Sequence, residues 1–316
     1  MKALLLYEPS APHRRALAEA APEAEVVVAR DAEHARRQIA DADAVLGNRH
    51  LVESLPAARR LAWVQTGSTG VDVILAADPP LGDAVLTCAR GVYDDEIADH
   101  ATALVLGLAR GLHRARDDQR ERRWPRYALT SLAGRRALIL GWGGVGRAIA
   151  RRLAACGMTI EAVRRRHAGA PADDGDGVLV HGPDRWRDAL PRADVLVGAL
   201  PLTDATRGIV GAAELDALPR GALVVNVGRG GTLDDGAVLA ALRSGHLGGA
   251  GLDVLTEEPP PADHPAWSEP RLLLTPHVAR SLEDAPRRWE PLFAENLRRF
   301  AAGEPLLGVV DRAAGY

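Results

Sequence analysis

Three glycines at a fixed spacing are the residues most suggestive of chemistry in this chain. Gly141, Gly143 and Gly146 have the G-x-G-x-x-G spacing, and they follow the apolar run Ala137–Leu140 and open a stretch with helical periodicity. In a strand–turn–helix unit, such glycines permit a tight turn, close approach of a pyrophosphate and close packing of the helix on the strand. The helix N-terminus then offers unpaired N–H groups and a partial positive charge to the phosphates. The segment predicts a dinucleotide-binding site.

An arginine cluster refines the identity of the dinucleotide. Arg164, Arg165 and Arg166 follow the next apolar run, Met158–Val163, about twenty residues beyond the glycines. A site for NAD usually has Asp or Glu there, because a carboxylate accepts hydrogen bonds from the ribose hydroxyls. An arginine instead binds the 2′-phosphate of NADP through charge-assisted, bidentate hydrogen bonds. A solvated basic turn is the alternative. We expect a preference for NADP(H), with NAD(H) as a usable second cofactor.

Three further polar residues, Arg229, Glu258 and His277, each come shortly after an apolar run that is typical of a buried strand. Ligands bind at the carboxyl ends of the strands in open parallel sheets. Arg229 would bind a 2-keto acid and polarise its carbonyl, and His277 would deliver a proton as a hydride arrives. Glu258 would orient the imidazole and stabilise its charged form. Taken singly, the three could equally be a helix cap, a surface-turn residue and a satisfied loop histidine.

The elements that would position these residues form two series of strands and helices, as in βαβ folds with parallel sheets. The first series has strands expected at Ala3–Tyr7, Glu25–Ala29, Ala44–Leu46, Leu61–Gln65 and Ala84–Cys88. The second begins at Ala137, with later strands at Met158–Val163, Val178–Val180, Asp194–Ala199, Ala222–Val227, Gly249–Leu252 and Leu272–Leu274. Expected helices include Pro12–Ala20, Ala32–Ala40, about Ile97–Arg120, Arg147–Cys156 and about Ser281–Ala302, and a polar turn is expected at Asp173–Gly177.

The composition is typical of a soluble globular protein, and the length is sufficient for two domains. The chain has 316 residues, 47% of them hydrophobic, and a formal net charge of −3, which gives no reason to expect binding to nucleic acid or membrane. The two cysteines, Cys88 and Cys156, make no disulfide framework and lack metal-ligand spacing, so no metal is expected. The N-terminal apolar run is too short for a signal peptide. These features favour a cytoplasmic location.

Several segments together resemble the D-isomer-specific 2-hydroxyacid dehydrogenases. The likeness extends over nearly the whole chain, and the segments occur in the order and spacing of that family. They are Gly141–Gly146, Leu200–Thr203, Asn226–Gly230, Gly251–Val254 with Glu258-Pro259, and Thr275–His277. Two departures are Asp99-His100, where Glu-His is common, and Gly228, where alanine is common. The Arg164–Arg166 cluster and the tail Val310–Tyr316 are similar to the glyoxylate/hydroxypyruvate reductases of this family.

The resemblance implies two Rossmann-like, doubly wound α/β domains with the active site in the cleft between them. Residues 1–97 and 282–316 would form a discontinuous substrate-binding domain, and residues 98–281 the dinucleotide-binding domain. The catalytic residues would be Arg229, Glu258 and His277. The substrate carboxylate would bind backbone N–H groups of Ser68, Thr69 and Gly70, together with Arg229. The cofactor would bind Gly141, Gly143, Gly144, Val145, Gly146, Arg164, Arg165, Pro201, Val227 and Asp253, the last holding the nicotinamide carboxamide.

The resemblance also implies a homodimer, with the helix near residues 98–120 and the segment Trp124–Tyr127 at or near the interface. The activity would be NADPH-dependent reduction of a 2-keto acid to a D-2-hydroxy acid, and residues 48–51 would border the pocket for the substrate side chain. One alternative is a non-catalytic, nucleotide-sensing corepressor on the same fold. Others are a formate dehydrogenase, in which glutamine replaces the residue equivalent to Glu258, and a phosphite dehydrogenase.

Overall fold

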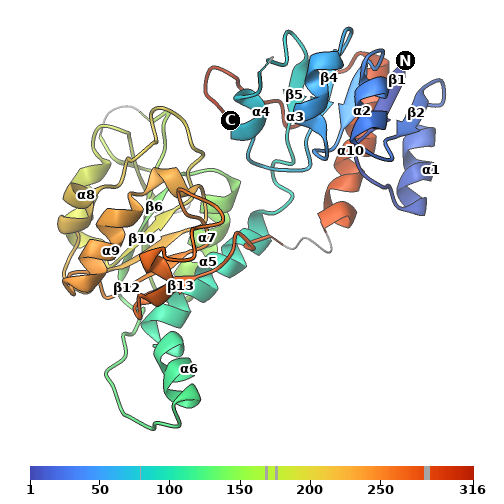
Figure 1. Cartoon of the computed structure of the whole chain (residues 1–316). Helices are drawn as coiled ribbons and strands as arrows, with labels where there is room; N and C mark the ends of the chain where they lie inside the picture. Colours follow the sequence, from blue (N-terminus) through green and yellow to red (C-terminus); the bar gives the residue numbers. More distant parts are fainter. Residues whose placement is uncertain (79, 168–169, 175–176, 281–284) are drawn as a thin grey trace. The chain divides into compact units, whose positions relative to one another are not determined.

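The computed structural model describes residues 1–78, 80–167, 170–174, 177–280 and 285–316, and it divides into two compact units (Figure 1). Unit 1 comprises Met1–Tyr93 with Ser281–Tyr316, and unit 2 comprises Asp94–Arg280. The expected division instead placed the first boundary after residue 97 and the second after residue 281.

Unit 1 is built on a parallel sheet with the strand order β2-β1-β3-β4-β5. Its strands are β1 (Lys2–Leu5), β2 (Glu25–Val28), β3 (Ala44–Leu46), β4 (Trp63–Gln65) and β5 (Val85–Thr87). Its helices are α1 (Ala11–Ala20), α2 (Ala32–Ile39), α3 (Leu51–Ser54), α4 (Asp72–Leu75) and α10 (Ala285–Ala302). The first two helices begin at side-chain caps, because Ser10 and Asp31 accept hydrogen bonds from the amides of His13 and His34.

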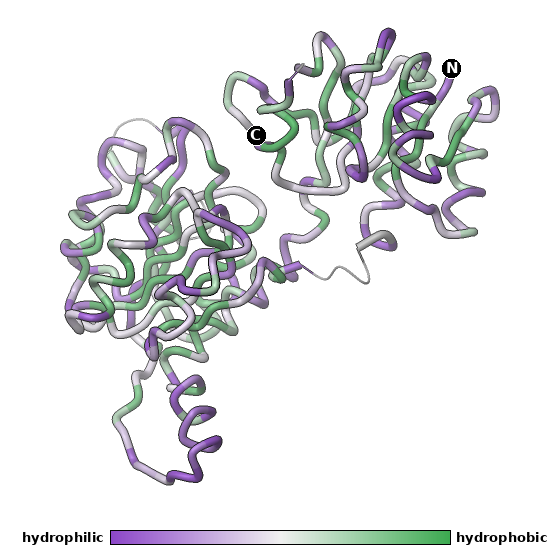
Figure 2. Tube along the Cα trace, in the orientation of Figure 1, coloured by the Kyte–Doolittle hydropathy of each residue, from purple (hydrophilic) through white to green (hydrophobic). Residues whose placement is uncertain are grey.

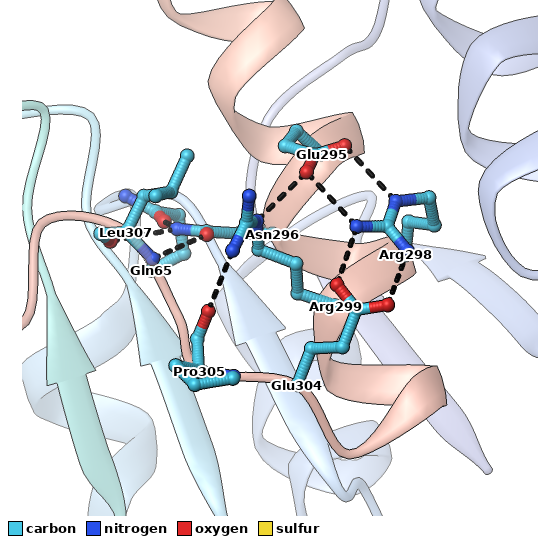
Figure 3. Close-up of polar contacts among 8 residues, drawn as sticks. All are labelled: Gln65, Glu295, Asn296, Arg298, Arg299, Glu304, Pro305 and Leu307. Atoms are coloured by element: carbon cyan, nitrogen blue, oxygen red, sulfur yellow. Dashed lines mark hydrogen bonds and ion pairs between the residues drawn. The ribbon is translucent and has the colours of Figure 1, made fainter.

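A network of buried, uncharged side chains joins α10 to this sheet (Figure 3). Asn296 donates to Gln65 Oε1 (2.7 Å) and to the carbonyl of Leu307 (2.9 Å), and accepts from the Leu307 amide (2.8 Å). Gln65 Oε1 also accepts from the hydroxyl of Thr87 (2.8 Å). Every polar atom in these contacts has a partner, so the network fixes the end of β4 against the last helix.

Unit 2 contains a larger sheet with the order β13-β12-β11-β10-β6-β7-β9-β8, parallel except for the pair β8–β9. Its strands are β6 (Arg136–Leu140), β7 (Thr159–Val163), β8 (Ala172–Asp173), β9 (Leu179–His181), β10 (Val195–Gly198), β11 (Leu223–Asn226), β12 (Gly249–Leu252) and β13 (Leu272–Leu274). The chain starts in the middle of the sheet at β6 and adds strands outward on both sides. The strand order therefore reverses between β6 and β10, which is where such sheets bind ligands.

The helices of unit 2 are α5 (Asp94–Ala109), α6 (Leu112–Arg120), α7 (Gly144–Ala155), α8 (Ala212–Asp216) and α9 (Asp235–Arg243). Figure 2 shows hydrophobic residues concentrated along the strands and hydrophilic residues on α6, which projects from unit 2 with the segment after it. Across the described ranges, no helix combines the length and apolar character that crossing a bilayer requires.

Two expectations about secondary structure were wrong in detail. The helix expected from about Ile97 to Arg120 is two helices, because the chain breaks at Gly111, which has a φ of 62° that favours glycine. The expected polar turn at Asp173–Gly177 contains part of the short strand β8, and residues 175–176 lie outside the described residues. Residues 281–284 of the expected last helix also lie outside them, and α10 is described from Ala285.

Candidate active site

The glycine loop joins β6 to α7 at the reversal of the strand order. Gly141 has a φ of 109°, and a Cβ there would lie 2.5 Å from the carbonyl oxygen of Ala199. A Cβ on Gly146 would overlap the carbonyl oxygen of Gly141. At Gly143, by contrast, the described residues place no heavy atom within 4 Å of an added Cβ. The loop is crowded toward the sheet and open at Gly143, which fits a pyrophosphate at the N-terminus of α7.

Gly144 has a structural role that its place in the motif does not explain. The carboxylate of Asp94, the first residue of α5, occupies the position that a Cβ on Gly144 would need. Burial and, to a lesser extent, the neighbouring Asp95 raise the pKa of Asp94. The next residue, Val145, is half-buried in the first turn of α7. A larger side chain at residue 144 would therefore disturb the packing of α5 on α7.

The arginine cluster lies beside the glycine loop. The carbonyl of Val163, at the end of β7, accepts hydrogen bonds from the amides of Gly141 (3.3 Å) and Trp142 (3.0 Å). Arg164, Arg165 and Arg166 follow directly and are exposed. Because β6 and β7 are parallel neighbours, their carboxyl ends place the cluster and the glycine loop at the same edge of the sheet.

Arg229 follows β11 at this same edge. Its carbonyl accepts hydrogen bonds from Asn226 Nδ2 (2.9 Å) and Thr232 Oγ1 (2.6 Å), both on buried residues, so its backbone is held from within. Its guanidinium also donates to the carbonyl of Gly228 (2.9 Å). A Cβ on Gly228 would lie 2.6 Å from the carbonyl oxygen of Leu200, which accounts for glycine where the family commonly has alanine.

Pro201 and Val227, two expected cofactor contacts, follow the neighbouring strands β10 and β11. The amide of Val227 donates to the carbonyl of Gly198 (3.0 Å), and its side chain is buried. The carbonyl of Pro201 accepts from Thr206 Oγ1 (2.6 Å), which closes the turn after β10. Pro201 therefore lies at the reversal of strand order with the glycine loop, and Val227 lies one strand further along the same edge.

Glu258 and His277 form a direct pair. Nδ1 of His277 lies 2.7 Å from Oε2 of Glu258, and Oε1 of Glu258 accepts from the amide of Leu255 (3.0 Å). The side chains of Glu258 and His277 are 35% and 44% exposed, so the pair is held by the protein yet open to a ligand. With Nδ1 engaged, Nε2 is the ring nitrogen that can meet a substrate. The geometry is that of a carboxylate orienting a proton-transferring imidazole.

Asp253, at the end of β12, holds the loop that carries His277. Its side-chain oxygens accept from the amides of Val278 (2.9 Å, Oδ1) and Ala279 (3.0 Å, Oδ2), and Oδ1 also accepts from Thr275 Oγ1 (2.6 Å). Burial alone would raise the pKa of Asp253, but hydrogen bonds from His100, Thr275 and these amides lower it. We expected the residue to contact the nicotinamide carboxamide. In the structure both oxygens bind this loop.

Two residues near Asp253 received no role from the sequence. Nε2 of His100, on α5, lies 2.9 Å from Thr275 Oγ1 and 3.4 Å from Asp253 Oδ1. Thr275 lies in a segment that carries the family resemblance, and His100 follows Asp99, one of the two departures from the family pattern. Without knowing that α5 packs against β12, however, the sequence cannot connect His100 to a loop 175 residues away.

In unit 1, the loop expected to bind the substrate carboxylate follows β4. Asn48 Oδ1 accepts from the amide of Gly67 (2.8 Å), and Asn48 Nδ2 donates to Ser68 Oγ (3.0 Å). The amide of Ser68 donates to Thr66 Oγ1 (3.0 Å), so this expected donor is already engaged within the loop. For the amides of Thr69 and Gly70, the described residues provide no hydrogen-bond acceptor.

Comparison with known proteins supports one family over most of the chain. Residues 102–279 match the model of the D-isomer specific 2-hydroxyacid dehydrogenase, NAD binding domain. A glyoxylate/hydroxypyruvate reductase A from Salmonella choleraesuis is 33% identical over 272 residues, which cover 82% of this chain and 83% of that protein.

Solved structures agree over the full length. The NADPH-dependent glyoxylate/hydroxypyruvate reductase from Sinorhizobium meliloti, in complex with NADP and sulfate, is 29% identical with a TM-score of 0.85, over 100% of this chain and 99% of that one. A D-isomer specific 2-hydroxyacid dehydrogenase from Xanthobacter autotrophicus Py2, in complex with NADPH and MES, is 32% identical with a TM-score of 0.83, over 99% of both chains. The expected fold class and nicotinamide dinucleotide cofactor are confirmed. The chain belongs to the D-isomer specific 2-hydroxyacid dehydrogenases and is an NAD(P)-dependent oxidoreductase of that family.

Proposed function

We propose that this protein reduces a small 2-keto acid, of the glyoxylate or hydroxypyruvate kind, to a D-2-hydroxy acid with NADPH as the preferred cofactor. The observation that carries the proposal is the 2.7 Å pair of His277 and Glu258. Arg229 lies at the carboxyl edge of the same sheet. The named reductases from Salmonella and Sinorhizobium support the substrate class.

The proposed chemistry divides between these three side chains. Arg229 binds the substrate carboxylate and polarises the keto oxygen, since a guanidinium matches a carboxylate with two parallel hydrogen bonds. His277 gives the proton on Nε2 to the oxygen that becomes the hydroxyl. Glu258 fixes the orientation of the ring through Nδ1. When bound, the nicotinamide supplies the hydride.

The proposed preference for NADPH depends on Arg164 and Arg165. Both follow β7 beside the glycine loop, and no Asp or Glu occupies the strand end. The solved relatives that contain NADPH or NADP support the same choice. The guanidinium groups would hold the 2′-phosphate, which NAD lacks.

In unit 1, we propose that the amides of Thr69 and Gly70 bind the substrate carboxylate. Successive backbone N–H groups in a turn make a small anion site. Ser68 contributes through the shape of the loop, because its amide is bonded to Thr66 and its hydroxyl to Asn48.

A panel of keto acids tests the proposal. Glyoxylate, hydroxypyruvate, pyruvate and a bulky aromatic keto acid would each be assayed with NADPH and with NADH, and the chirality of the product determined. We expect the highest kcat/KM for one of the small keto acids with NADPH, and a D product whenever the product is chiral. A protein that binds NADPH but turns over none of these compounds would favour a sensing role and contradict the proposal.

We also propose that the protein forms a homodimer through α6 and the segment after it, and that it acts in the cytoplasm. Three apolar side chains on this projecting part are exposed: Leu112 (60%), Trp124 (97%) and Leu129 (43%). Exposed apolar side chains on a projecting segment are available to a protein interface. Light scattering after size-exclusion chromatography should give a dimer for the wild type and a monomer for the Trp124→Glu, Leu129→Glu variant. A wild-type monomer would contradict the proposal.

A further inference from the structure

The short loop Thr275–Ala279 holds His277 in an unfavourable backbone conformation. His277 has a φ of 53°, in the left-handed region, which non-glycine residues adopt only when their surroundings enforce it. The direction of the imidazole depends on this backbone, because the Cβ position follows from the main-chain angles. Whatever holds the loop therefore also determines where Nε2 of His277 lies.

Asp253 holds this loop by its backbone and its side chain at once. The His277 amide donates to the Asp253 carbonyl (2.8 Å), and the amides of Val278 and Ala279 donate to the carboxylate (2.9 and 3.0 Å). Thr275, at the start of the loop, donates its hydroxyl to the same carboxylate (2.6 Å). The Asp253 side chain is 1% exposed, so its orientation depends on these partners.

The available protons identify His100 as the hydrogen-bond donor to Thr275. The Thr275 hydroxyl has one proton, and the 2.6 Å contact gives it to Asp253, which as a carboxylate can only accept. The contact of 2.9 Å between Thr275 Oγ1 and Nε2 of His100 must then be donated by His100. The same nitrogen is 3.4 Å from Asp253 Oδ1, so His100 lies next to both groups that hold the loop.

We propose that His100 is a positioning residue for catalysis, which holds His277 in its reactive place through Thr275 and Asp253. The inference rests on the proposed role of His277 as proton donor. His100 comes from α5, which packs against β11 and β12, so it ties the loop to the body of unit 2. A displacement of about 1 Å in a reacting group can reduce the rate by about a hundredfold. A lost hydrogen bond at His100 should therefore lower kcat.

Two substitutions at His100 distinguish the effect of losing the hydrogen bond from the effect of losing the volume of the ring. His100→Leu fills similar space but has no donor, whereas His100→Gln keeps an N–H at similar reach. We expect His100→Leu to lower kcat by about tenfold to a hundredfold with KM and the Kd for NADPH little changed, and His100→Gln to recover most of that loss. His246→Leu is the matched control, because His246 in unit 2 also bonds through Nε2, to the Leu215 carbonyl (3.0 Å).

A double-substitution cycle with His277→Asn shows whether the effect acts through His277. Rates would be measured in single turnovers with enzyme in excess, so that slow reactions remain measurable. We expect His100→Leu to have no further effect in the His277→Asn background. An equal loss in both backgrounds, or wild-type kcat in His100→Leu, would overturn the positioning role. Thr275→Val supplies the same test if His100→Leu does not fold.

The two proposals fail in different ways. A fully active His277→Asn enzyme would refute the proposed proton donor, whatever happens at His100. An inactive His277→Asn enzyme combined with an unaffected His100→Leu enzyme would leave the proton donor in place and refute only the positioning role.

Discussion

The loop after β4 in unit 1 and the loop after β13 in unit 2 are both held tightly, but by different kinds of group. In unit 1, neutral amide and hydroxyl groups hold residues 66–68, and Gln65, whose Nε2 donates to the carbonyl of Thr66, joins them to the buried network around Asn296. In unit 2, the carboxylate of Asp253 holds residues 275–279, and a second carboxylate, Glu258, holds His277 itself.

The difference matches the chemistry proposed for each loop. A loop that only binds an anion through backbone amides needs a fixed shape, and neutral hydrogen bonds keep that shape regardless of pH. A loop that presents a proton donor gains from nearby negative charge, because the charge stabilises the imidazolium form. The predictions below test this contrast, beginning with the largest expected effect.

Replacing Arg229, the proposed anchor of the substrate carboxylate, should lower activity strongly. Arg229→Lys keeps the positive charge but loses the planar pair of donors that matches a carboxylate. We expect kcat/KM for keto acids to fall by about a hundredfold or more, with the Kd for NADPH little changed. Steady-state kinetics and fluorescence titration with NADPH measure the two effects. An unaltered kcat/KM would remove Arg229 from the proposed site.

The arginine cluster should decide between the cofactors. Loss of a charge-assisted phosphate contact costs about 1.5–3 kcal/mol, so the Arg164→Ala, Arg165→Ala variant should bind NADPH roughly tenfold to a hundredfold more weakly. The affinity for NADH should change little, because NADH has no 2′-phosphate. Titration with both cofactors gives the ratio, and a wild type that prefers NADH would contradict the assignment.

The neutral network of unit 1 should matter for stability more than for catalysis. Asn296→Ala removes the hydrogen bonds that a buried side chain makes to Gln65 and to the backbone of Leu307, which should lower the free energy of unfolding by about 2–4 kcal/mol. Denaturant unfolding measures this change. At temperatures where the variant is folded, its kcat should match the wild type.

The matched control for Asn296 is Arg298, which lies two residues further along α10 and is more exposed than the buried Asn296. It pairs with Glu295 (3.0 Å) and Glu304 (2.6 Å), as Figure 3 shows. Ion pairs between exposed side chains contribute little, so Arg298→Ala should destabilise much less. Equal effects of the two substitutions would contradict the importance given to the buried neutral network.

The smallest expected effect is a loss of stability at low pH in the loop that Asp253 holds. The pKa of Asp253 is lower in the folded protein than its ordinary value of about 3.9, so an opened loop takes up a proton more readily than the closed one. The stability that Asp253 adds is complete above about pH 3.9 and is lost as the pH falls through the lower, folded value. Native-state hydrogen exchange should show the Ala279 amide losing protection in acid relative to the Gly67 amide, whose acceptor is the neutral Asn48. An equal loss of protection at both amides would contradict the proposed difference between the charged and the neutral loop contacts.

Much of the fold and several site positions were predictable because they depend on local pattern. The apolar runs predicted the central strands, and the spacing of Gly141, Gly143 and Gly146 predicted the turn between β6 and α7. Glu258 and His277 were named from their positions near strand ends, and they form a pair.

What the sequence could not supply depends on contacts between distant segments. The carboxylate beside Gly144 belongs to Asp94, and the donor to Thr275 is His100. Each of these is fixed by packing rather than by periodicity. The binding of both Asp253 oxygens to the loop of residues 275–279 likewise depends on packing.

The most direct test of the account is the single-turnover reduction of glyoxylate by His277→Asn with NADPH already bound. Asparagine can still hydrogen-bond near Glu258, but it cannot donate a proton as an imidazolium does. We predict that NADPH binds with wild-type affinity and that oxidation of the bound cofactor nearly ceases. Oxidation at the wild-type rate would contradict the central claim that His277, held by Glu258, supplies the proton.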